Sequence, residues 1–149
     1  MKFTILTIGK IKNQAIQELV DDYALRLQHY IKLELLIAKT EQAALAKISS
    51  REAVHSDMVW LCDERGEQFS SKDLAAVFNK HQLFSNKMAR RLVFVIGDAN
   101  GHGDQMKARA DKLISFSKMT FPHEIAQVIL LEQLYRAFTI IKGEKYHKE

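Results

Sequence analysis

The sequence contains few of the residues that cross-link a chain or interrupt its regular structure. Its 149 residues include one cysteine, one proline and six glycines. The lone Cys62 cannot form an internal disulfide, which excludes a disulfide-stabilised scaffold and fits a reducing compartment. No apolar run approaches the roughly 20 residues of a membrane-spanning helix, and residues 1–9 are too short for the core of a signal peptide. We therefore expect a cytoplasmic protein without a membrane span.

The composition is that of one folded domain. Hydrophobic residues make up 47% of the chain and charged residues 27%, as in globular proteins. No linker, repeat or low-complexity segment divides the chain, so we expect a single domain over residues 1–149. The formal net charge of +4 permits contact with nucleic-acid phosphates, but it equally fits a mildly basic, solvated surface.

Short β-rich apolar runs alternate with longer amphipathic stretches. The spacing predicts strands at 3–8, 33–37, 59–62, 91–96 and 114–119, the third ending in a turn at 63–66. It predicts helices at 13–30, 41–55, 70–81, 104–113 and from Pro122 to about Ile141. This alternation favours an α/β fold with a parallel sheet and helices on both faces. The last helix is apolar around most of its circumference, so we expect it to be deeply buried or covered by a partner chain.

A glycine-containing loop follows the fourth strand, from Gly97 to Gly103. Glycine lets backbone approach a ligand closely, but the spacing is not a dinucleotide fingerprint and lacks the Lys-Ser/Thr of a phosphate loop. Alone, the loop favours an ordinary strand-to-helix turn over a cofactor loop. Aromatic residues flank a lysine at Phe116, Lys118 and Phe121. This pattern likewise favours two core aromatics and one surface lysine over a ligand site.

The remaining polar residues give weaker signals. The six histidines include no pair at the i, i+4 spacing of a helical zinc site, so we expect no metal site. Glu132 and Arg136 lie one helical turn apart and are expected to form a structural ion pair. The terminal Tyr146, His147 and Lys148 can exchange protons near neutral pH and meet phosphate, although a solvated polar tail is an equal alternative.

Four sequence blocks together match a known family. They read VFVIG at 93–97, LISFSKMTFPH at 113–123, EQLYRAF at 132–138 and GEKYHK at 143–148. In these blocks, and in a likeness that runs the full length, the chain resembles the RlmH-type (YbeA-like) SPOUT methyltransferases. The resemblance implies a carboxyl-terminal trefoil knot, an exception to the usual avoidance of knots. It also implies a homodimer that uses S-adenosyl-L-methionine to methylate N3 of a pseudouridine in 23S ribosomal RNA on the assembled ribosome.

The resemblance assigns residues to the cofactor pocket and to the chemistry. The implied pocket comprises Leu61, Gly97, Phe116, Ser117, Lys118, Met119, Thr120 and Phe121. His147 is implied as the general base, with Tyr146 supporting it and Lys148 meeting phosphate. A base near the working pH contributes roughly 10²–10⁴-fold to such a step.

The chain departs from the family pattern at two positions. Asp98 stands where members have a second glycine, and Gln127 stands where members carry an arginine. These departures suggest an alternative, a divergent homologue that binds S-adenosyl-L-methionine or ribosomal RNA with little or no methyl transfer. The strand–helix alternation alone would also allow a flavodoxin-like nucleotide-binding domain, with an unknotted last helix.

Overall fold

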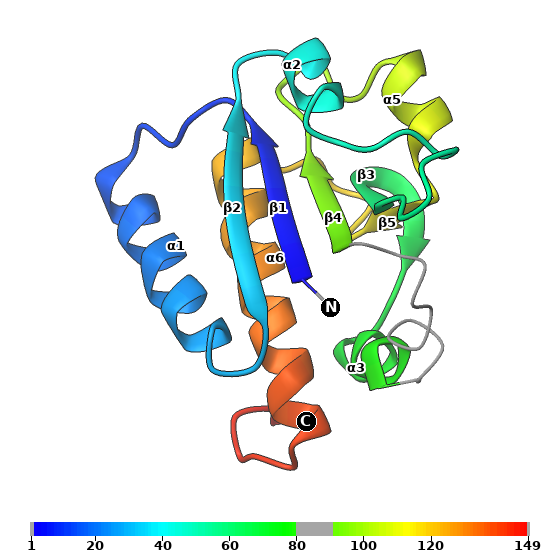
Figure 1. Cartoon of the computed structure of the whole chain (residues 1–149). Helices are drawn as coiled ribbons and strands as arrows, with labels where there is room; N and C mark the ends of the chain where they lie inside the picture. The colour runs from blue at the N-terminus through cyan, green and yellow to red at the C-terminus, as the bar shows by residue number, and fades with distance from the viewer. Residues whose placement is uncertain (1, 80–90, 149) are drawn as a thin grey trace.

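A five-stranded parallel sheet forms the centre of the computed structural model, which describes residues 2–79 and 91–148 (Figure 1). The spatial strand order is β2-β1-β4-β3-β5, and each neighbouring pair is parallel. The strands are β1 (Lys2–Ile8), β2 (Lys32–Ala38), β3 (Met58–Gln68), β4 (Arg91–Ile96) and β5 (Lys112–Ser115). The helices are α1 (Gln14–Leu27), α2 (Glu41–Leu45), α3 (Ser71–Asn79), α5 (Asp104–Arg109) and α6 (His123–Ile141).

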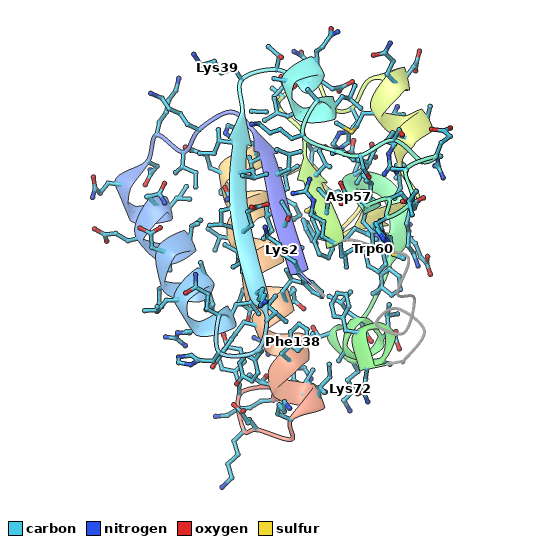
Figure 2. All side chains as sticks on the ribbon, viewed as in Figure 1. Lys2, Lys39, Asp57, Trp60, Lys72 and Phe138 are labelled. Carbon is cyan, nitrogen blue, oxygen red and sulfur yellow. The ribbon has the colours of Figure 1, made fainter. Side chains whose placement is uncertain are left out.

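Each face of the sheet carries its own hydrophobic core. Helices α1, α3 and α6 pack on one face and α2 and α5 on the other. On the first face, the ring of Phe78 on α3 lies 6.1 Å from Trp60 of β3 and 5.9 Å from Phe138 of α6, measured between centroids (Figure 2). The predicted α/β fold, with a parallel sheet covered on both sides, is therefore confirmed. The trefoil knot and the single-domain assignment stay predictions.

The predicted helix at 41–55 was too long, because α2 ends at Leu45. The Ser49 amide donates to the Asp57 carboxylate at 2.9 Å, and the Asp57 amide donates to Ser49 Oγ at 2.6 Å. Arg109 Nε donates to the Ser49 carbonyl at 2.7 Å, and Arg91 binds the Lys47 carbonyl. Side chains thus form hydrogen bonds to backbone groups that would bond to one another in a longer helix.

The predicted boundary at residues 113–114 was also wrong. Helix α5 ends at Arg109, and β5 spans Lys112–Ser115 instead of 114–119. The Asp111 carboxylate accepts from the Val59 amide at 2.7 Å, and the Asp111 amide donates to the Val59 carbonyl at 2.8 Å, so the chain joins β3 early. Ser115 Oγ donates to the Ser117 carbonyl at 2.7 Å, and this local turn ends the strand.

The third strand continues past the turn predicted at 63–66. Strand β3 runs to Gln68, and its register with β5 shifts between Cys62 and Glu67. A strand can absorb extra residues as a bulge without ending. The predicted helix at 70–81 is α3, which begins at Ser71. His81, its predicted end, lies outside the described residues.

Candidate cofactor cleft and carboxyl-terminal tail

A cleft of about 450 Å³ opens beside the bulge of β3 and the carboxyl end of β4. Ligands of parallel sheets bind characteristically at this edge, where the strand order reverses. Residues of the β3–β5 bulge, the loop after β4, the segment after β5 and the start of α6 form its walls. The lining comprises residues 62–65, 96–102, 116–117 and 119–123 and Ala126.

Gly97 leaves room in the wall of this cleft. A β-carbon at Gly97 would lie 3.1 Å from His102 Cε1 and 3.2 Å from the Gly101 carbonyl oxygen, closer than ordinary packing allows. The turn that follows is held by the Asn100 amide, which donates to Asp98 Oδ1 at 2.9 Å. Asp98, the first departure from the family pattern, therefore stabilises its own loop.

His102 is a cleft residue that the sequence reasoning did not select. Its side chain is 7% exposed, and Nε2 lies 3.0 Å from the carbonyl oxygen of Cys62. Since a carbonyl can only accept, Nε2 carries the proton and Nδ1 is left as an acceptor. Within residues 2–79 and 91–148, this buried Nδ1 has no hydrogen-bond partner. A residue of the cleft wall thus keeps a buried acceptor without a partner.

Asp63 supplies a negative charge to the same cleft. The residue is 8% exposed, and the Arg65 amide and guanidinium donate to its carboxylate at 2.9 to 3.2 Å. Hydrogen bonds from Arg65 lower the pKa of Asp63 below its ordinary value, so the carboxylate stays ionised at neutral pH. The sequence reasoning took this stretch as a turn. A carboxylate directly after an apolar strand is the signal that could have identified it.

Most residues assigned to the pocket by the resemblance line the cleft. They are Gly97, Phe116, Ser117, Met119, Thr120 and Phe121. Lys118 is exposed and does not line it, and the side chain of Leu61 is fully buried in the core beneath α2 and α5. Gln127, the second departure, is buried on α6 and is likewise absent from the lining.

The predicted chemical residues lie in a second cluster, formed by Tyr146 and His147 against α1 and α6. The Tyr146 hydroxyl donates to Glu132 Oε1 at 3.1 Å and lies 3.2 Å from the hydroxyl of Tyr23. Burial, followed by these contacts, raises the pKa of Tyr146, so it remains a neutral phenol. The His147 ring contacts Arg136, whereas Lys148 is exposed.

The cleft includes the start of α6. The tail follows the other end of α6 (Figure 1) and folds back onto Glu132. The cleft includes His123 and Ala126, and the tail packs beside Tyr135 and Arg136. Arg136 follows Ala126 by ten residues, which is about 15 Å along the helix axis. None of the tail residues Tyr146, His147 and Lys148 lines the cleft of the same chain.

The described part of the chain has neither a candidate metal cluster nor a membrane-spanning helix. Within it, no group of three or more histidine, cysteine, aspartate or glutamate side chains is arranged to hold a metal ion. Of the helices described, none has the length and apolar character needed to cross a membrane.

Comparison with known proteins identifies the family. A family model described as "Predicted SPOUT methyltransferase" matches residues 1–147. The chain belongs to the SPOUT methyltransferases. Relatives named "Ribosomal RNA large subunit methyltransferase H" match it along its length. Those of Geobacter metallireducens and Geotalea daltonii are 38% and 39% identical, each over 99% of both chains, and that of Desulfotalea psychrophila is 41% identical over 99% of this chain and 100% of its own.

Two solved methyltransferase structures share the fold of this chain despite low sequence identity. A probable methylase family protein from Haemophilus influenzae Rd KW20 matches with a TM-score of 0.54 at 10% identity, over 99% of this chain and 70% of its own. AviRb, a SpoU methyltransferase from Streptomyces viridochromogenes in complex with AdoMet, gives 0.52 at 10% identity, over 96% and 58%. The resemblance inferred from the four sequence blocks is thus confirmed at the level of the family.

Proposed function

We propose that this SPOUT methyltransferase methylates N3 of a pseudouridine in 23S ribosomal RNA on the assembled ribosome, with S-adenosyl-L-methionine as donor. The observation that carries the proposal is the cleft beside the β3 bulge and the end of β4, in a chain whose full-length relatives bear the name of a ribosomal RNA methyltransferase. A ribosomal RNA substrate also supports a cytoplasmic location.

The residues of the cleft fit S-adenosyl-L-methionine. Its volume of about 450 Å³ lies within the roughly 300–1,000 Å³ of small-molecule sites. The Asp63 carboxylate in the lining complements positive charge. Backbone at Gly97 and in the segment 116–121 would hold the group. When bound, it supplies an electrophilic methyl carbon attached to a positively charged sulfur.

The side chains around the cleft can orient the reactants and exclude water. Phe116 and Phe121 present apolar surface in the lining. Donor and acceptor atoms must approach to about 3–3.5 Å in line, so holding them in that geometry supplies much of the rate enhancement. The acceptor nitrogen of a uracil-type base must also lose its proton. The cleft side chains do not remove this proton by themselves.

We propose a homodimer in which the tail of one subunit completes the cleft of the other. Within one chain, Tyr146 and His147 contact Glu132 and Arg136 of α6 and do not line the cleft. Met119 at the cleft is 73% exposed, and Ile125 at the start of α6 is also exposed, which suits a surface covered by a partner. In this arrangement Tyr146, His147 and Lys148 act at the partner's cleft, with the ammonium of Lys148 meeting RNA phosphate. The trefoil knot would fix the path by which α6 reaches this interface.

A methylation assay with mapping of the product tests the proposed function. Labelled S-adenosyl-L-methionine is incubated with the protein and undermethylated ribosomes, and the labelled base is identified. We expect label on N3 of one pseudouridine in 23S RNA, and none with a Gly97→Val variant. Cofactor binding by calorimetry without transfer of label would instead support the divergent homologue, and label elsewhere in the RNA would contradict the proposed target.

A further inference from the structure

The contact between Arg136 and His147 determines where the imidazole proton lies. Arg136 Nη1 is 3.1 Å from His147 Nδ1. A guanidinium has only donors, and the neighbouring Glu132 carboxylate raises the pKa of Arg136, so this nitrogen cannot accept. His147 Nδ1 must therefore be the acceptor. A neutral imidazole that accepts at Nδ1 carries its proton at Nε2.

Arg136 is itself held in place from several sides. Its Nε donates to Glu132 Oε1 at 3.0 Å, and Nη2 binds the same oxygen. The guanidinium carbon lies 4.9 Å from the centroid of the Tyr146 ring, and the Tyr146 hydroxyl returns to Glu132. The side chain is largely enclosed, so it does not exchange these partners freely for water. The contacts that hold Arg136 against His147, and so select the tautomer, are therefore formed by Glu132 and Tyr146.

His147 Nε2 is left available for a ligand. Across the described residues, the only hydrogen bond of the His147 side chain is the one to Arg136. The ring is half-buried, so it presents one edge outward while Nδ1 faces the guanidinium. The outward group is an N–H donor. To accept a proton at Nε2, the ring would have to move its proton to Nδ1 and lose the bond to Arg136.

We propose that Arg136 is a positioning residue that fixes His147 as the Nε2–H tautomer, so that His147 donates a hydrogen bond to the RNA base and does not take its proton. This inference rests on the proposed function, and it replaces the general-base role that the resemblance implied for His147.

The chemistry of a uracil-type ring gives such a donor a clear role. When the N3–H bond breaks, the proton passes to solvent water and the electron pair stays on the ring, shared between N3 and the two adjacent carbonyl oxygens. A hydrogen bond to one of those oxygens stabilises this charge and favours loss of the proton. The N3 pair then forms the bond to the methyl carbon, while the sulfur keeps the pair of the broken C–S bond. Fixed donors aimed at developing charge are a strong source of catalysis.

Nitrogen NMR of the full-length protein tests the tautomer without any activity. The His147 signals are assigned by their absence from the His147→Gln spectrum. We expect Nδ1 to resonate as an unprotonated, hydrogen-bonded nitrogen and Nε2 as a protonated one. Arg136→Lys should keep this pattern because it retains a donor, and Arg136→Leu should give a mixture of tautomers. A proton on Nδ1 in the unaltered protein overturns the proposal.

Turnover of two His147 variants separates a donor from a base. His147→Gln keeps an amide N–H near the position of Nε2 but has no titratable nitrogen. We expect His147→Gln to stay within about tenfold of the unaltered protein and His147→Ala to lose roughly 10²–10³-fold, as when one fixed donor is removed. His55→Gln, at an exposed position, is the matched control.

The two experiments test the donor role and the proposed function independently of each other. If glutamine loses as much activity as alanine, while both variants bind cofactor normally, the donor role is wrong. If the unaltered protein transfers no methyl to ribosomal RNA, the proposed function fails, and the nitrogen spectrum still decides the tautomer.

Discussion

The two ends of helix α6 hold clusters of opposite construction. At the amino-terminal end, the cleft depends on a missing side chain at Gly97, a loop that hydrogen-bonds to itself and apolar side chains such as Phe116. At the carboxyl-terminal end, Tyr146 and Arg136 are surrounded by hydrogen bonds and ring contacts. The cleft is therefore damaged by adding atoms and the tail by removing them. Because the tail residues do not line the cleft of their own chain, we expect a reaction that needs both to use two chains.

Mixing two inactive variants gives the largest expected effect. Gly97→Val damages the cleft and His147→Ala damages the tail, so each homodimer should be nearly inactive. A mixed dimer pairs the intact cleft of one chain with the intact tail of the other. Turnover should therefore return when the chains are co-expressed and the mixed species is purified by two different affinity tags.

The contrary result of that mixing experiment is equally informative. If the mixed dimer is as inactive as its parents, the tail does not serve the partner's cleft. If a demonstrably monomeric sample methylates ribosomal RNA at full rate per chain, the dimer is not required.

Two glycines, one at each end of α6, should respond differently to a side chain. Gly97→Val places atoms within 3.1–3.3 Å of the His102 ring and Gly101 backbone, and we expect the Kd for S-adenosyl-L-methionine to rise about 100-fold, equivalent to about 2.7 kcal/mol. Gly143, past the end of α6, has φ of +69° and no neighbour within 4 Å of an added β-carbon. Gly143→Ala should lower the free energy of unfolding by about 1–2 kcal/mol from backbone strain alone.

Calorimetry and urea unfolding measure both quantities on both glycine variants. The cofactor affinity of Gly143→Ala should match that of the unaltered protein. If Gly97→Val and Gly143→Ala lost the same cofactor affinity, the contrast between the cleft and the carboxyl-terminal end of α6 would be wrong.

Removing the Tyr146 hydroxyl should have a moderate effect. Tyr146→Phe keeps the ring contact with Tyr135 but loses the hydrogen bonds to Glu132 and Tyr23. We expect about 1 kcal/mol less stability and slower turnover at unchanged cofactor affinity, since the tail loses part of its attachment. Tyr30→Phe removes the bond to Glu144 outside this cluster, and it should affect stability more than turnover. Steady-state kinetics and chemical unfolding of both variants distinguish the effects.

The smallest expected effect concerns acid stability at the cleft. Asp63 has a lowered pKa in the folded protein, chiefly because Arg65 donates to it. Its contribution to stability is therefore complete above the unfolded pKa near 3.9 and disappears as the pH falls through the lower folded value. Since the Arg65 side chain is 67% exposed, Arg65→Ala should cost only little stability at pH 7. Urea unfolding from pH 7 down to pH 2 should show this difference shrinking below about pH 4.

Much of the fold could be predicted from the sequence, because apolar runs and helical periodicity are local signals. The five strands and the long apolar α6 were recognised on that basis. The wrong boundaries lie where distant groups compete for backbone. Asp111 reaches Val59, and Arg109 reaches Ser49. No local pattern carries that information.

The candidate site was only partly predictable, for the same reason. The resemblance identified Gly97 and the segment after β5, both of which line the cleft. It missed Asp63 and His102, whose roles arise because β3 and β4 lie side by side in the sheet. It included Leu61, whose side chain the core buries, and Lys118, whose side chain lies away from the lining.

The position of β1 in the sheet affects how the chain folds during its own synthesis. Strand β1 pairs with β4 from Lys2↔Arg91 onward, and its Phe3 ring packs against Phe138 of α6. A nascent chain emerges from its amino-terminal end, so β1 can pair early with β2 but must wait for β4 and α6. Side chains such as Phe3 stay incompletely covered until then, which slows folding and favours a requirement for chaperones at high expression.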